Sequence, residues 1–199
     1  MSTPLDMASA ELRYSQADAY FLAAFQEIVM KEGGYVDDPF DSGGKTRYGI
    51  TERVARAHGY KGAMRKLSLQ TAERIYKAAY WHPLELGEIS LIDANVAFKL
   101  FDIAVNMGTH RAGVFLQRCL NVFNDRERHY KDIAEDGAVG PKTIAALYAY
   151  FGVRPKDGAE VLVRSLNCLQ GAFYIDLAER RQKDERFVFG WMKNRVHAL

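Results

Sequence analysis

Apolar residues return every three or four positions along most of the chain, which is the spacing of one face of an α-helix. The pattern predicts helices over residues 17–31, 51–58, 68–80, 91–107, 109–123, 141–150 and 158–183. Residues 1–16 are mostly polar and lack this spacing, so we expect a flexible N-terminal leader there. Because amphipathic helices bury their apolar faces against one another, the pattern predicts a mainly α fold.

One stretch near the start of the chain breaks the helical pattern. Residues 35–51 contain Pro39, three glycines and short strand-forming pieces such as Tyr35-Val36. Short pieces of this kind between turn-forming residues predict an irregular β-hairpin or a small sheet with a glycine-rich turn. We therefore expect one small β element early in an otherwise helical chain.

The most hydrophobic segment, residues 91–107, is expected to form a central helix that is buried on most sides. Its few polar residues fall on one helical stripe, which consists of Asn95, Lys99, Asp102 and Asn106. Lys99 and Asp102 stand three positions apart, so we expect them to form an internal ion pair. The stripe predicts one polar seam in an apolar core.

Composition and charge exclude several broad classes of protein. The 199 residues are 48% hydrophobic and 12% aromatic, which is typical of a globular chain and not of a disordered one. The formal net charge of +2 is too small to predict a nucleic-acid partner. No apolar run reaches the length of a membrane span, so we expect no stable membrane insertion. Residues 1–16 lack the pattern of a secretory signal, which predicts synthesis in the cytoplasm.

Cysteine and histidine positions give no evidence of a metal or cofactor site. Cys119 and Cys168 match no metal-binding spacing, and we expect two buried apolar residues, with a single disulfide bridge as the alternative. The histidines, which are His58, His82, His110, His129 and His197, form no spaced set of ligands. We therefore expect neither a metal nor a cofactor.

A glutamate at the end of the first predicted helix is the first candidate for chemistry. Glu32 precedes Gly33 and Gly34, which let the backbone bend sharply and leave space for a ligand. Partial burial raises the pKa of a glutamate and keeps it protonated near neutral pH, as a general acid in glycoside cleavage requires. The alternative is a solvated glutamate in the last turn of a helix.

Two residues that follow the glycines could act together with Glu32. Asp41 follows it by nine positions and Thr46 by fourteen, so a hairpin folding back over the helix end would bring the three side chains into one cleft. A carboxylate and a hydroxyl opposite a carboxylic acid can hold and activate a water molecule. Asp37 and Asp38 are competing carboxylates, and their alternative role is to form turns.

These residues belong to a longer ordered motif. Residues 32–39 read Glu-Gly-Gly-Tyr-Val-Asp-Asp-Pro, and residues 41–51 follow the pattern Asp-x-Gly-Gly-x-Thr-x-Tyr-Gly-Ile-Thr. The motif strongly resembles the opening of glycoside hydrolase family 108, the N-acetylmuramidases found among phage endolysins and related bacterial proteins. Further similar segments lie at residues 80–81, 101–117, 136–143 and 187–195, so the resemblance covers roughly residues 20–196.

The resemblance implies a lysozyme-like, mainly α fold. It also implies hydrolysis of the β-1,4 bond between N-acetylmuramic acid and N-acetylglucosamine in bacterial peptidoglycan, with Glu32 as the acid that protonates the leaving oxygen. Asp41, assisted by Thr46, would stabilise the transition state or activate water on the other face of the sugar. Thr51 can be aligned with the same family position as Thr46, so the identity of the threonine stays open.

The same motif region and the central helix offer candidates for substrate binding, because sugar rings pack their apolar faces on aromatic side chains. The candidates are Tyr35, Asp37, Tyr48, Trp81 and Asn106. Each aromatic residue could instead belong to the core. Asn106 could donate to an N-acetyl group or bond locally at the end of its helix.

We expect three regions, which are a flexible leader at residues 1–16, a lysozyme-like catalytic region at 17–124 and a helical C-terminal peptidoglycan-binding-type region at 125–199. The resemblance suggests that the last region helps to hold the wall polymer, although packing alone explains its apolar stripe equally well. We expect a monomer with peptidoglycan as its partner. It would act at the cell wall or in the periplasm after release by a holin or another export route.

Two other functions remain open at this stage. A lytic transglycosylase has a similar fold and one glutamate but forms a 1,6-anhydro end without water, and Asp41 and Thr46 favour hydrolysis over it. The other alternative is a non-enzymatic protein that binds the wall or assists secretion.

Overall fold

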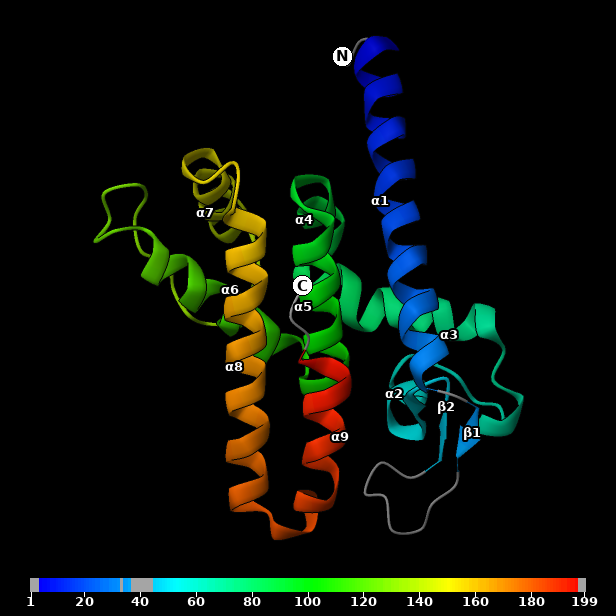
Figure 1. The fold of residues 1–199 in the computed structure, drawn as a ribbon. Helices are drawn as coiled ribbons and strands as arrows, with labels where there is room; N and C mark the ends of the chain where they lie inside the picture. Colours follow the sequence, from blue (N-terminus) through cyan, green and yellow to red (C-terminus); the bar gives the residue numbers. More distant parts are fainter. Residues whose placement is uncertain (1–3, 33, 37–44, 197–199) are drawn as a thin grey trace. The chain divides into compact units, whose positions relative to one another are not determined.

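A computed structural model describes residues 4–32, 34–36 and 45–196, apart from the side chains of residues 4–8, 10, 30–32 and 36 (Figure 1). The chain forms two compact units, Met1–Pro83 and Leu84–Leu199. Each unit is mainly helical, and strands occur only in the first unit among these residues. The predicted fold class, mainly α with one small early β element, is confirmed.

The first unit begins with a long helix and continues through a small sheet into shorter helices. Its elements are α1 (Pro4–Glu32), β1 (Tyr35–Val36), β2 (Thr46–Arg47), β3 (Ile50–Thr51), α2 (Glu52–Ala57), η1 (Met64–Lys66), α3 (Leu69–Tyr76), η2 (Lys77–Trp81) and η3 (His82–Leu84), which runs into the second unit. Residues 1–16, expected to form a flexible leader, are helical from Pro4, where α1 begins. Proline is tolerated in the first turn of a helix, and residues 5–16 contain neither glycine nor another proline.

The three strands form an antiparallel sheet in the order β1-β2-β3. Arg47 pairs with Ile50, so the connection between β2 and β3 is the two-residue turn Tyr48-Gly49. Their φ angles of 52° and 73° are both positive, as a type I′ hairpin turn requires. Glycine adopts this conformation freely at position 49. At position 48, the carbonyl oxygen of Tyr48 accepts a hydrogen bond of 2.9 Å from the Tyr76 hydroxyl.

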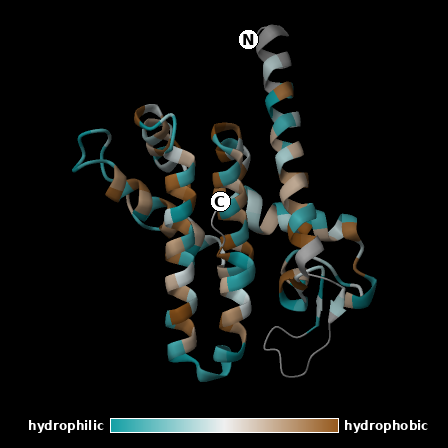
Figure 2. Ribbon diagram, in the orientation of Figure 1, coloured by the Kyte–Doolittle hydropathy of each residue, from teal (hydrophilic) through white to brown (hydrophobic). Residues whose placement is uncertain are grey.

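The second unit consists of helices only, in the part of the chain that the structure describes. They are α4 (Leu86–Ile92), α5 (Ala94–Met107), α6 (Thr109–Phe123), α7 (Pro141–Val153), α8 (Gly158–Arg180), η4 (Gln182–Asp184) and α9 (Glu185–Arg195). Helices α8 and α9 run antiparallel as a hairpin, and the turn between them is hydrophilic (Figures 1 and 2). Gly190 lies inside α9.

Helix α5 is the centre of the second unit, as its hydrophobicity predicts. Its side chains at Leu100, Phe101 and Ile103 are fully buried. Gly108 ends the helix with a φ of 87°, a value that favours glycine, and serves as the N-cap of α6. The two cysteines are free, with Cys119 buried and Cys168 exposed, so the structure shows neither a bridge nor a second buried thiol.

Amide side chains of α6 hold the long loop that connects it to α7. The buried Gln117 accepts a hydrogen bond of 2.8 Å from the Gly137 backbone N–H and donates one of 2.9 Å to the Asp136 carboxylate. Asn121 exchanges two hydrogen bonds of 2.9 Å with the backbone of Ile133. Partly buried backbone groups of the loop are thus satisfied by side chains in place of a strand or helix partner.

The loop also passes very close to the backbone of α6 at Gly113. A Cβ atom at this position would lie 2.2 Å from the carbonyl oxygen of Gly137. Real Cβ atoms do not approach backbone oxygens so closely, so the contact requires glycine. Gly152, near the end of α7, has open space where its Cβ would be.

These two helical glycines predict opposite effects of the same substitution. Gly113→Ala should lower the free energy of unfolding by about 1–3 kcal/mol, because the loop or the helix must move. Gly152→Ala should leave it unchanged or raise it by up to about 1 kcal/mol, because alanine favours the helix. Urea denaturation of the full chain measures both, and equal midpoints for the two variants would contradict the close approach.

Candidate functional site

The candidate acid stands where the first helix gives way to the sheet. Glu32 is the last residue of α1, and β1 begins three positions later at Tyr35. Between them, Gly34 has open space around the position of a Cβ atom. The side chain of Glu32 and the whole of Asp37 and Asp41 lie outside the described residues. Their meeting in one cleft therefore stays a prediction.

The register of the sheet places Thr46 and Tyr35 on opposite faces. Thr46 pairs with Thr51 and Tyr35 pairs with Arg47. Paired residues share a face, whereas successive residues alternate between faces. The face with Arg47 also carries Ile50, which is buried, so this face turns toward the core of the unit. Thr46 lies on the other face and is half-buried.

The structure distinguishes between the two threonines that match the same family position. The Thr51 hydroxyl accepts a hydrogen bond of 3.4 Å from the backbone N–H of Val54 and so caps the N-terminus of α2. Threonine is one of the residues preferred at a helix N-cap. Since Thr51 has a structural role at the end of a helix, Thr46 is the better candidate for the catalytic site.

Arginines lie over the two candidate tyrosines. The guanidinium of Arg65 lies 5.1 Å from the ring centre of Tyr35, and that of Arg47 lies 5.0 Å from the ring centre of Tyr48. Both tyrosines are half-buried. One face of each ring is therefore covered by a cation, so a sugar could stack only on the other face.

Trp81 belongs to the core of the first unit. Its side chain is 2% exposed, and its ring meets Phe21 edge to face at 5.3 Å between centres. A ring that is covered on all sides cannot stack on a sugar in this conformation. The core role, which the sequence left open as the alternative, is the one that the structure shows.

Asn106 bonds locally at the end of α5. Its amide nitrogen donates to the backbone oxygen of Asp102 at 2.8 Å and to the carboxylate of the same residue at 3.1 Å. Because an amide nitrogen carries two hydrogens, both of its donors are used. The amide oxygen is left to contact a ligand, and the predicted role as a donor to the substrate would require these bonds to break.

The polar seam of α5 continues into a buried network with α8 and α9. The Lys99 ammonium is 3.5 Å from the Asp102 carboxylate, so the predicted ion pair is confirmed. It also donates to the side-chain oxygen of Gln170 and, at 2.9 Å, to the backbone oxygen of Arg195. Gln170 in turn donates to Asp102 at 3.0 Å and to the Tyr174 hydroxyl at 3.4 Å. Burial raises the pKa of Tyr174 to about 12, so this hydroxyl stays neutral.

A cavity of about 490 Å³ lies next to this network, entirely within the second unit. It is lined by Asn106, Met107, Arg111, Phe173, Leu177, Arg180 and Arg181. Sequence reasoning singles out only Asn106 in this set and also misses Gln170 and Arg195. These residues come from different helices, so no local spacing joins them.

Metal-binding groups and membrane-spanning helices can be assessed for residues 4–32, 34–36 and 45–196. Within them, no group of three or more His, Cys, Asp or Glu residues is arranged to hold a metal ion. None of the helices there has both the length and the apolar character that crossing a membrane requires.

Comparison with known proteins assigns a family to each part of the chain. Residues 25–108 match the family described as glycosyl hydrolase 108, and residues 111–196 match the one described as predicted peptidoglycan domain. The family boundary near residue 110 differs from the division of the fold after Pro83, and the expected boundary after residue 124 stays a prediction.

A solved structure has a similar fold. "Structure of Brucella abortus SagA" is 23% identical in sequence, with a TM-score of 0.58 over 90% of this chain and 99% of that chain. None of the curated proteins matches the sequence.

The two family matches are separated by residues 109–110 and together span the helix end, the sheet, the buried network and the cavity described above. The first match includes Glu32 and Thr46, and the second includes Arg111 and Gln170. Because residues 25–108 match the glycosyl hydrolase 108 family and residues 111–196 match a predicted peptidoglycan domain, the chain is a glycoside hydrolase that acts on peptidoglycan.

Proposed function

We propose that the enzyme is an N-acetylmuramidase in which Glu32 is the general acid. It would hydrolyse the β-1,4 bond between N-acetylmuramic acid and N-acetylglucosamine. Glu32 protonates the leaving oxygen, while Asp41 and Thr46 stabilise the transition state or activate a water molecule on the other face. Because the wall lies outside the cytoplasm, release through a holin or another export route is part of this proposal.

The position of Glu32 on α1 is the observation that carries this proposal. The buried residues Phe21, Phe25 and Ile28 follow one another at intervals of four and three positions. Glu32 comes four positions after Ile28, so helical spacing puts it next on the same stripe. The partial negative charge at a helix C-terminus also disfavours an ionised carboxylate. A general acid needs a protonated carboxyl group, and a position at the end of an apolar helical stripe suits that role.

Removal of the acid tests the assignment directly. Glu32→Gln keeps the size of the side chain but removes the proton donor, so the rate of wall hydrolysis should fall on the order of 10²–10⁴-fold. Glu11→Gln, an exposed position on the same helix, is the matched control and should keep full activity. Clearing of a peptidoglycan suspension measures both variants, and an unchanged rate for Glu32→Gln would contradict the role of this residue.

Substitutions of the two threonines should have different effects, one on the reaction rate and the other on the stability of the fold. Thr46→Val should lower the turnover number while leaving KM similar, because it removes a hydroxyl that acts in the transition state. Thr51→Val should lower the free energy of unfolding by about 1 kcal/mol through loss of the α2 cap, with the turnover number retained. Steady-state kinetics and thermal denaturation of both variants check this. The reverse assignment holds if Thr51→Val removes activity and Thr46→Val does not.

The products identify both the bond and the reaction. Peptidoglycan digested by the enzyme is reduced with borohydride and analysed by mass spectrometry. Hydrolysis adds one water for each bond broken, and the new ends should be reduced N-acetylmuramic acid. Reduced N-acetylglucosamine ends would mean that the enzyme cuts the other glycosidic bond. Ends with a 1,6-anhydro ring would mean a lytic transglycosylase, and the roles of Asp41 and Thr46 in hydrolysis would then be wrong.

A further inference from the structure

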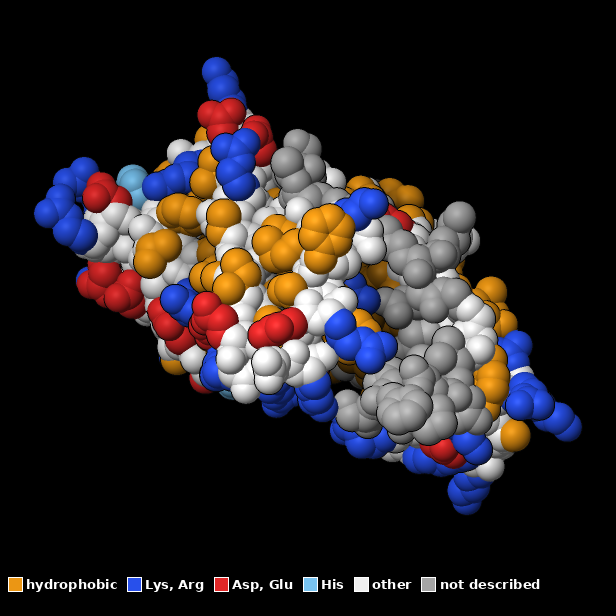
Figure 3. All heavy atoms as spheres, turned by 60° about the horizontal axis from the view of Figure 1, so that its bottom comes forward, with side chains coloured by type: hydrophobic (Ala, Val, Ile, Leu, Met, Phe, Trp, Pro, Cys, Tyr) orange, Lys and Arg blue, Asp and Glu red, His pale blue; other side chains and the backbone are white. Residues whose placement is uncertain are grey.

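The cavity of the second unit is cationic, and the proposed cleavage chemistry makes no use of it. The end of α5 and the start of α6 form one wall, and the C-terminal part of α8 with Arg181 forms the other. Figure 3, in which the lower end of Figure 1 comes forward, shows hydrophobic side chains gathered beside charged side chains of both signs. The volume of the cavity, about 490 Å³, is within the range of small-molecule sites.

Two of its three arginines are not neutralised by an acidic side chain. Arg180 pairs with Asp176 at 2.6 Å. In the described part of the chain, neither Arg111 nor Arg181 has a carboxylate within 4.0 Å. Two guanidinium groups in one cavity without an acidic partner favour an anionic ligand.

Arg111 is held in place by an aromatic ring. Its guanidinium carbon lies 3.9 Å from the ring centre of Phe173, and the residue is half-buried. Stacking covers a flat face of the guanidinium. The N–H donors point outward from its edge, in the plane of the group. A planar group with fixed donors matches the two oxygens of a carboxylate.

The cavity also offers one acceptor beside the cations. Both amide hydrogens of Asn106 are bonded to Asp102, which in turn accepts a bond from Gln170. The amide oxygen of Asn106 receives no hydrogen bond from the described residues. This oxygen could accept an N–H from a ligand, and Leu177 and Met107 supply apolar surface nearby.

We propose that this cavity binds a free carboxylate of the peptide stems of peptidoglycan. A stem peptide carries the three features that the cavity matches, which are a carboxylate, amide N–H groups and short apolar side chains. The glycan strand itself is a weaker match, because N-acetylated sugar rings bear no negative charge of their own. The inference rests on peptidoglycan as the substrate, and it assigns the second unit a separate contact with that polymer. A phosphate-bearing wall polymer shares the anionic chemistry but lacks the amide and apolar groups.

Titration calorimetry of the full chain tests the proposal. The probes are a synthetic stem peptide with free carboxylates, the same peptide with its carboxylates amidated, and inorganic phosphate. The free peptide should bind, the amidated peptide should bind at least tenfold more weakly, and phosphate should not compete. A stem peptide contains no glycosidic bond, so this result is independent of whether the enzyme cleaves the glycan as proposed.

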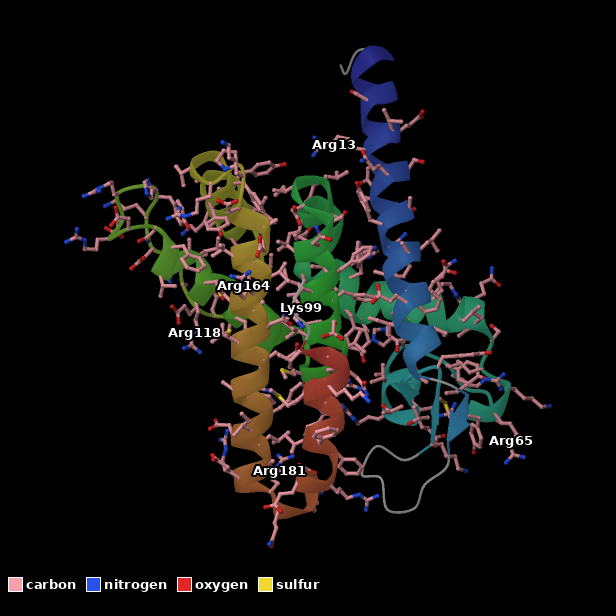
Figure 4. All side chains as sticks on the ribbon, in the orientation of Figure 1. Arg13, Arg65, Lys99, Arg118, Arg164 and Arg181 are labelled. Carbon is pink, nitrogen blue, oxygen red and sulfur yellow. The ribbon has the colours of Figure 1, made fainter. Side chains whose placement is uncertain are left out.

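Arginine variants then locate the site. Arg111→Gln should weaken binding of the free peptide at least tenfold, and Arg111→Lys should fall between it and the native chain, because lysine keeps the charge but not the paired donors. Arg181→Glu reverses a charge at an exposed position, so it tests the cavity without disturbing the core. Controls are Arg118→Gln on α6 and Arg164→Gln on α8, both exposed and outside the cavity (Figure 4).

Three outcomes would overturn the proposal. Equal binding of the free and amidated peptides would show that no carboxylate is recognised. Equal loss in the cavity variants and the control variants would show that only the overall charge matters. Phosphate that binds as tightly as the free peptide and displaces it would assign the cavity to a phosphate-bearing polymer.

Discussion

The second unit depends on a buried positive charge. Lys99 is 9% exposed on the central helix α5, and a charge in such a place is tolerated only when it is paired and hydrogen-bonded. Its partners include Asp102 on the same helix, Gln170 on α8 and a backbone oxygen at Arg195 on α9. Loss of any partner would leave polar groups buried without bonds. The ammonium thereby fixes how three helices lie against one another.

The arrangement around Lys99 also shapes the cavity next to it. Asp102 binds the ammonium with one carboxylate oxygen and Asn106 with the other, so the orientation of the Asn106 amide follows from the ion pair. Helices α8 and α9 also pack against each other at Gly171, where the Met192 methyl carbon lies 3.4 Å from the position of a Cβ, an ordinary van der Waals distance. A single buried network therefore supports both the helix packing and the polar wall of a binding site.

Features that arise from neighbours in sequence were predictable, and those that join distant segments were not. The α2 cap at Thr51, the buried α5 and its Lys99–Asp102 pair all follow from spacing within one turn or two. Gln170 stands 71 positions from Lys99, and no local pattern connects them. The cavity likewise needs three helices at once. Trp81 shows that residue type alone is also insufficient. An aromatic residue suits both a core and a sugar site, and only its burial in the structure decides between them.

Binding at a peptide stem and cleavage of a glycan bond would act on different parts of one polymer. Contacts made equally in the ground state and the transition state lower KM without raising the turnover number. Variants of Arg111 or Arg181 should therefore change the concentration of peptidoglycan that the enzyme needs, whereas variants of the proposed catalytic residues Glu32 and Thr46 should change the rate of bond breaking. KM would then report on binding by the second unit, and the turnover number on cleavage by the first. A cell wall whose stem carboxylates are amidated would then be cut with an unchanged turnover number but a raised KM.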